Sequence, residues 1–214
     1  MERSVEPNGS LPYSLYAKRR LRVSRADYYL IINIKYLLLP SESQEVGRAM
    51  IGSELEGALN DQIRKEFYSS YLYLSMAAQF ESMNLKGFAH WMQVQANEET
   101  KHGMKIFAHV VERGGKVTLQ PIDAPPSNWK SAKEMFTAAY QHEQKVTESI
   151  NKIVELARTK KDNATEVFLQ WFVNEQVEEE ASTNEVTQKL QLIGDNAPAL
   201  VMLDAELGKR SGDS

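Results

Sequence analysis

The sequence predicts an all-α protein: an antiparallel four-helix bundle with one long crossover between its second and third helices, plus a short C-terminal fifth helix. Three observations favour this fold. Four long segments carry apolar residues every three to four positions, as amphipathic helices do. A proline-containing connection, residues 116–130, separates the second segment from the third. No stretch shows the alternating pattern typical of a β-strand.

The first helix is predicted over residues 53–81 and the second over residues 88–113. Apolar residues recur along the first at Leu55, Leu59, Ile63, Phe67, Tyr71 and Leu74. Residues 84–87 interrupt the pattern between the two helices. The second helix is expected to end at Gly114 and Gly115, because glycine readily adopts the backbone conformation that follows a helix.

The long connection is expected to run the length of the bundle, since a loop of this size is not needed for a tight turn. Ser131 and Glu134 have the spacing of a capping box and predict the start of a third helix, which extends to about residue 158. A fourth helix follows over residues 164–192 and a short fifth over residues 197–207. Residues 209–214 are predicted to form a flexible tail.

Composition limits the chemistry that the chain can perform. The absence of cysteine excludes disulfides, cysteine-ligated metal sites and thiol catalysis, and fits the reducing cytoplasm, where we expect the protein. Residues 1–49 carry eight basic and five acidic residues, net +3, whereas the rest carries 17 basic and 24 acidic residues, net −7. This acidic body argues against nucleic acid as a partner and favours cations.

Residues 1–49 lack helical periodicity and form a separate N-terminal extension. Their apolar run, residues 28–39, contains Asn33 and Lys35 and is too short and too polar to span a bilayer, so no membrane association is expected. Three interpretations stay open: a disordered or loosely attached appendage, a poor export signal, or translated sequence upstream of a start at Met50. We favour the third.

A Glu-x-x-His pair lies near the middle of the second helix. Glu99 and His102 are three positions apart, so they project from one face and can offer an oxygen and a nitrogen to the same metal ion. Glu98 adds a neighbouring carboxylate. Alone this spacing is a weak signal, because helical proteins contain many such pairs by chance.

The other three long helices carry matching acids on faces that otherwise look buried. Glu66 shares a face with Tyr73 on the first helix, and Glu143 lies on the third. On the fourth helix one stripe contains Trp171, Glu175, Glu178 and Glu179, with Gln176 beside it. Buried carboxylates need a neutralising partner, so acids from four helices predict two bound ions of iron or manganese, bridged by Glu99.

The remaining polar residues have plainer interpretations. Glu180 is expected to belong to a solvated acidic face, which is the usual fate of a charge run. His90, His109 and His142 lack a partner acid at metal-ligand spacing on the same face and are expected to be surface or structural residues.

Residues 50–208 resemble the bacterial and archaeal non-haem ferritins. The resemblance rests on four motifs, at residues 64–73 (RKEFYSSYLY), 96–102 (ANEETKH), 142–144 (HEQ) and 168–180 (FLQWFVNEQVEEE). It identifies residues 50–208 as a ferritin-like di-iron domain. Met50 stands where chains of this family normally begin, which is why we favour translated upstream sequence for residues 1–49.

The resemblance implies a ferroxidase that oxidises Fe(II) to Fe(III) with dioxygen or hydrogen peroxide. The ferric product would be stored as mineral inside a hollow shell of 24 identical subunits. One iron would be held by Glu66, Glu99 and His102. The second would be held by Glu99, Glu143 and Glu179, with Gln176 close to it. A third would be held by Glu98, Glu175, Glu178 and Glu179, and Tyr73 and Trp171 would lie beside the centre.

Two departures separate the chain from neighbouring families. Bacterioferritins place a haem-ligating methionine in the helix-two motif where this chain has Thr100, so no haem is expected. Bacterioferritins and rubrerythrins carry a second Glu-x-x-His on the fourth helix, whereas Ser182 follows Glu179 here. A soluble di-iron oxidase or peroxidase without storage, and a helical interaction protein with an acidic face, stay as alternatives.

Overall fold

The computed structural model describes residues 50–212, so the predicted N-terminal extension lies outside the described residues. These residues form five helices and no strand: α2 (Ser53–Ser82), α3 (Lys86–Glu112), α4 (Ala132–Thr159), α5 (Asn163–Ile193) and α6 (Ala197–Leu207). The all-α prediction is confirmed, and each predicted helix is found within a few residues of its expected ends. None of the described helices is long and apolar enough to cross a membrane.

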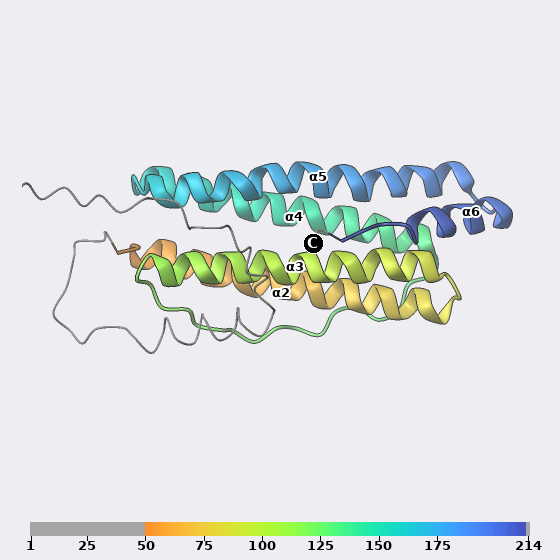
Figure 1. Cartoon of the computed structure of the whole chain (residues 1–214), viewed down its shortest axis with the longest axis horizontal. Coiled ribbons are helices and arrows are strands. Elements are labelled where there is room, and N and C mark those ends of the chain that lie inside the picture. The colour runs from red at the N-terminus through yellow and green to blue at the C-terminus, as the bar shows by residue number, and fades with distance from the viewer. Residues whose placement is uncertain (1–49, 213–214) are drawn as a thin grey trace, which may run out of the picture. The chain divides into compact units, whose positions relative to one another are not determined.

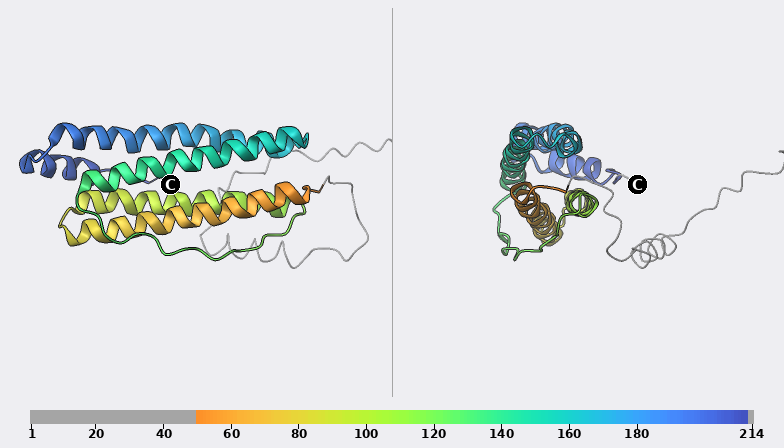
Figure 2. Two further views of the ribbon diagram at one scale, coloured as in Figure 1. Left: turned by 180° about the vertical axis from the view of Figure 1, so that it is seen from behind. Right: turned by 90° about the vertical axis from the view of Figure 1, so that its left-hand side faces the viewer.

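The four long helices form two hairpins, with α2 packed on α3 and α4 packed on α5 (Figures 1 and 2). The connection from α3 to α4 runs along the bundle as predicted (Figure 1). Hydrogen bonds attach it to α2, since Asn60 accepts from the Thr118 amide at 2.7 Å and Ser75 donates to the Pro126 carbonyl at 2.6 Å.

The helix ends follow the local signals in the sequence. The Ser131 hydroxyl accepts a hydrogen bond from the Glu134 amide at 3.2 Å, which confirms the predicted cap of α4. Asp162 caps α5 in the same way through the Thr165 amide at 3.1 Å. Gly114 follows α3 with a φ of 70°, a conformation that glycine adopts without steric cost.

Two apolar clusters fill the bundle and leave a polar layer between them. One cluster, around Phe80, Phe88 and Phe136, is also covered by α6. The other, around Leu59 and Ile150, lies toward the first residues of α2. Each long helix therefore passes from one apolar cluster to the other, and the acidic residues near its middle lie at the level between them.

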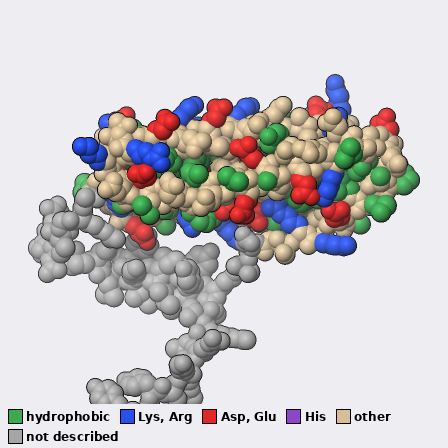
Figure 3. All heavy atoms as spheres, turned by 90° about the horizontal axis from the view of Figure 1, so that it is seen from above, with side chains coloured by type: hydrophobic (Ala, Val, Ile, Leu, Met, Phe, Trp, Pro, Cys, Tyr) green, Lys and Arg blue, Asp and Glu red, His purple; other side chains and the backbone are tan. Residues whose placement is uncertain are grey.

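Some residues assigned to the apolar stripes face outward instead. Tyr71 and Leu74 on α2 are 52% and 48% exposed. A helix rotates about 100° per residue, so four successive four-residue steps from Leu55 to Tyr71 rotate the side chain about 160° away from the core. Figure 3 shows hydrophobic side chains interspersed with acidic and basic ones on the face above α5.

Candidate metal centre

Four buried glutamates, one from each long helix, form the polar layer: Glu66, Glu99, Glu143 and Glu179. His102 is buried one turn along α3 from Glu99. Like charges this close in a water-poor interior repel strongly unless protons or cations neutralise them. The arrangement is therefore suited to positive ions.

The side chains of this layer form two overlapping groups. Glu66, Glu99 and His102 each offer a ligand atom within 4.8 Å of the others, and so do Glu99, Glu143 and Glu179. Glu99 belongs to both groups, as expected for a bridging carboxylate. Its Oε2 lies 3.6 Å from His102 Nδ1. These are the two predicted ligand sets, and the fold brings both of them together.

Burial sets the protonation of the layer when no cation is present. Loss of water around the carboxyl group raises the pKa of Glu66 to about 6 and that of Glu143 to about 7. The same cause raises the pKa of Glu99 and of Glu179 well above the usual range, reinforced by the neighbouring carboxylates. In the metal-free protein these carboxyl groups therefore keep their protons to a higher pH than exposed glutamates do.

The same buried environment keeps the His102 imidazole in its neutral form. Burial, helped by the charges of Lys105 and Lys101, lowers its pKa to about 4. The imidazole is therefore neutral at physiological pH and keeps a nitrogen lone pair for a metal. No proton has to leave this residue before it binds.

Two buried glutamines that the sequence analysis missed orient the carboxylates. Gln62 donates to Glu66 at 2.8 Å, and Gln95 donates to Glu179 at 2.5 Å and to Glu99 at 3.2 Å. Each glutamine lies four residues before a ligand candidate on its own helix, so a repeated Gln-x-x-x-Glu spacing is the signal that was available. Such partners fix the geometry of the groups that bind a metal.

Tyr73 and Gln176 contact Glu143 from opposite helices. The Tyr73 hydroxyl donates to a carboxylate oxygen of Glu143, and Gln176 Nε2 donates to the other at 3.3 Å. Both residues are buried. The predicted positions of Tyr73 beside the centre and of Gln176 near the second ligand group are therefore found.

The residues predicted to hold a third iron lie together at the side of the bundle. Glu98, Glu175, Glu178 and Glu179 line a pocket of about 220 Å³, which Ser182, Arg210 and Ser211 complete. Glu175 also lies within ligand range of His102 and Glu179. We call this pocket the outer pocket, and the two buried ligand groups the inner groups. Because Glu179 belongs to the buried layer as well, the outer pocket and the inner groups share one carboxylate.

Trp171 shields the centre but is not a core residue. It is 37% exposed, and its ring lies edge-on 5.3 Å from the His102 ring, measured between centroids. Lys105 Nζ lies 4.0 Å from the centre of the Trp171 ring. The indole therefore separates His102 from solvent on this side.

The three remaining histidines have structural partners. His109 stacks on Phe168 with 3.8 Å between ring centroids and contacts the Thr165 hydroxyl at 3.1 Å. His142 Nε2 lies 2.7 Å from the Ser69 hydroxyl, and His90 Nε2 lies 2.9 Å from the Arg210 carbonyl oxygen. No metal-binding group found among residues 50–212 includes any of the three.

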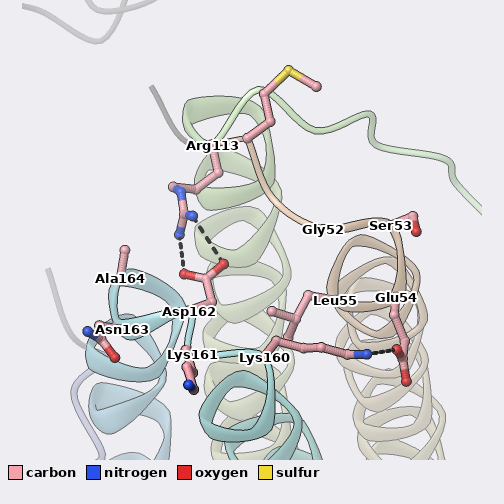
Figure 4. A pocket seen from close by; sticks show the side chains of 11 residues that line it. Gly52, Ser53, Glu54, Leu55, Arg113, Lys160, Lys161, Asp162, Asn163 and Ala164 are labelled. Carbon is pink, nitrogen blue, oxygen red and sulfur yellow. Dashed lines mark hydrogen bonds and ion pairs between the residues drawn. The ribbon is translucent and has the colours of Figure 1, made fainter. Parts of the chain in front are cut away.

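A second hollow, of about 590 Å³, lies at the end of the bundle where α2 and α5 begin (Figure 4). Two ion pairs line it: Arg113 with Asp162 at 2.8 Å, and Lys160 with Glu54. Four of the charged side chains that line the hollow are thus paired with one another. We assign this region a structural role in joining the helix ends.

Comparison with known proteins agrees with the site geometry. The Ferritin-like domain pattern matches residues 56–193. The bacterial non-haem ferritin of Bacteroides fragilis is 39% identical over 161 residues, which cover 75% of this chain and all of that protein. The corresponding protein of Staphylococcus aureus is 38% identical over 164 residues, covering 77% of this chain and 99% of its own length.

Solved structures give the same assignment at higher identity. An open-pore ferritin from the archaeon Archaeoglobus fulgidus is 52% identical, with a TM-score of 0.75 over 75% of this chain and 99% of that one. An engineered closed form of the ferritin from the same organism also gives a TM-score of 0.75 at 52% identity, covering 76% of this chain and 99% of its own. With this fold, this buried carboxylate layer and these relatives, the chain belongs to the ferritin family.

Proposed function

We propose that this ferritin oxidises Fe(II) at a di-iron ferroxidase centre and stores the ferric product as mineral inside a hollow shell of 24 subunits. Family membership supports a role in iron storage. The observation that supports a di-iron ferroxidase centre is the pair of ligand groups that share Glu99 in the buried layer. The absence of cysteine and the solubility expected of such a shell favour the cytoplasm.

Each ligand group is assigned one Fe(II) ion as substrate. Glu66, Glu99 and His102 hold the first, and Glu99, Glu143 and Glu179 the second, with Gln176 orienting Glu143. Carboxylate oxygens suit hard cations, and a shared carboxylate holds two ions close enough to act together. Each iron gives one electron to the oxidant, either dioxygen or hydrogen peroxide, and hydrolysis of the Fe(III) product releases protons.

The residues around the ligands have supporting roles. Gln62 and Gln95 hold the carboxylates of Glu66, Glu99 and Glu179, and Tyr73 holds Glu143. Glu98, Glu175, Glu178 and Glu179 in the outer pocket are assigned the third iron. Since Glu179 belongs to the second ligand group and also lines this pocket, we assign it the transfer of iron from one place to the other.

The test is aerobic addition of Fe(II) to the purified protein, followed by size-exclusion chromatography and an iron count per particle. We expect rapid Fe(III) formation and hundreds of irons eluting with a large assembly. Retention of only two irons per subunit would instead indicate a di-iron oxidase without storage. A particle of monomer or dimer size would rule out the shell.

Substituting Tyr73 by phenylalanine tests the role of a residue that contacts a candidate iron ligand. The variant loses only the hydroxyl that donates to Glu143. We expect it to bind two Zn(II) ions per subunit as before, while the initial rate of Fe(II) oxidation in stopped-flow absorbance falls on the order of tenfold. Tyr71→Phe is the matched control, because Tyr71 is exposed on the same helix. Equal rates for the two variants would exclude a role for the Tyr73 hydroxyl.

A further inference from the structure

The chain beyond α6 returns along α3 toward the middle of the bundle. Asp204 Oδ1 accepts hydrogen bonds from the amides of Gly87 at 2.8 Å and Phe88 at 3.0 Å, so it caps α3 from a distant part of the sequence. Leu203 and Leu207 are buried in the adjacent apolar cluster. These contacts fix the place from which residues 208–212, which we call the C-terminal strap, start.

Gly87 makes this close docking possible. A Cβ atom added there would lie 1.6 Å from the Asp204 carbonyl oxygen, and neither backbone can move aside without shifting a helix. The position of the strap thus depends on the absence of a side chain at residue 87.

The strap carries Arg210 to the outer pocket. Its Nη2 lies 2.5 Å from Glu98 Oε2, and its guanidinium lies 4.2 Å from the centre of the Trp91 ring. The Arg210 side chain is 21% exposed and that of Glu98 14%, so the ion pair is largely shielded from water. His90 also contacts the Arg210 carbonyl oxygen.

Arg210 is the one basic residue among the described residues that line the outer pocket. The remaining lining is four carboxylates and two serines. A guanidinium and a metal ion compete for the same carboxylate oxygens and repel each other at this range. The hold on the guanidinium is incomplete, because its buried Nη1 has no hydrogen-bond partner among residues 50–212. The contact is therefore displaceable.

We propose that Arg210 is a tethered cation that competes with metal for the outer pocket, so that a metal ion binds there only when the C-terminal strap is displaced. This inference rests on the proposed iron chemistry of the inner ligand groups. It makes Arg210 a residue that sets the occupancy of the third site and the passage of iron out of the inner pair.

The first test is calorimetric titration of the metal-free assembled protein with Zn(II), comparing wild type, Arg210→Ala and Lys209→Ala. Lys209 is the matched control, since it is exposed, carries the same charge on the same strap, and does not line the pocket. We expect Arg210→Ala to bind the outer Zn(II) on the order of tenfold more tightly, with the inner pair unchanged. Lys209→Ala is expected to behave as wild type.

A second variant moves the arginine without removing it. Gly87→Ala pushes α6 away from α3, and should raise outer-site affinity in the same direction as Arg210→Ala. Because linkage is reciprocal, Zn(II) bound at the outer site must also loosen the strap. We therefore expect faster tryptic cleavage after Arg210 in Zn(II)-loaded wild type than in the metal-free protein, measured by mass spectrometry.

The outcomes separate the two proposals. An outer-site affinity that is equal in wild type and Arg210→Ala, or lower in the variant, with the inner pair filled in both, would overturn the role of Arg210 and leave the ferroxidase centre standing. Failure of the inner pair to bind metal in wild type would overturn the ferroxidase centre itself. Cleavage after Arg210 that is unchanged by Zn(II) would contradict displacement of the strap.

Discussion

Replacing Glu99 by alanine will reduce the rate of Fe(II) oxidation on the order of a hundredfold or more, the largest effect expected of any single substitution in this protein. The reason is that Glu99 is the one residue common to both inner ligand groups. In the proposed centre, each iron would then lose an oxygen ligand and the two ions would lose their bridge. Substituting Glu66 removes a ligand from one group only, so its effect is expected to be smaller.

The measurement is stopped-flow formation of Fe(III) in air, alongside Zn(II) stoichiometry by titration. Glu112→Ala provides the control, because Glu112 is an exposed glutamate on the same helix. We expect that variant to match wild type in rate and in the two inner sites. Oxidation by Glu99→Ala at the wild-type rate would show that the inner groups are not the ferroxidase centre.

Metal affinity will rise steeply with pH between about 6 and 8. At pH 6.5 the carboxyl of Glu143, with a pKa of about 7, is largely protonated in the free protein, and burial also raises the pKa of Glu99 and of Glu179. A metal ion must displace those protons, so affinity rises about tenfold per pH unit for each proton displaced. Zn(II) titration calorimetry in buffers of different ionisation enthalpy measures the number of protons released when the metal binds. We expect at least one proton per inner metal pair at pH 6.5, and a pH-independent affinity would contradict this.

The same shifts set the stability of the metal-free protein. A carboxyl whose folded pKa is raised favours folding at low pH, and that contribution is lost as pH rises through about 6 for Glu66 and about 7 for Glu143. The lowered pKa of His102 and of His142, both about 4, acts in the opposite direction, because their contribution is lost as pH falls through 6.5 toward 4. The buried carboxyls therefore destabilise the metal-free protein as pH rises from about 4.5 to about 7, and the two histidines offset part of that loss.

The fold was largely predictable because its signals are local. Helix periodicity, the Ser131 cap and Gly114 each act within one or two turns, and the long crossover follows from loop length. The buried acids of the candidate centre could also be predicted, since an acid such as Glu143 interrupts an apolar stripe in the sequence itself. The outward-facing Tyr71 and Leu74 were assigned wrongly, because steps of four residues drift around the helix.

What the sequence did not predict depends on contacts between distant segments. Arg210 reaches Glu98 only because Asp204 docks on the first turn of α3 beside Gly87, and no local pattern encodes that docking. Gln95 lies on the same helix as Glu99, but its bond to Glu179 spans 84 positions in the chain. Residues that orient ligands from another helix therefore leave only a weak trace in the sequence.

The most direct test of the di-iron centre is a crystal structure of the protein loaded anaerobically with Fe(II), with anomalous difference maps recorded at the iron edge. We predict two peaks per subunit in the buried layer, one bound by Glu66, Glu99 and His102 and the other by Glu99, Glu143 and Glu179, roughly 3.5–4 Å apart. Iron found only in the outer pocket or on the surface, with no peak touching Glu99, would contradict the assignment.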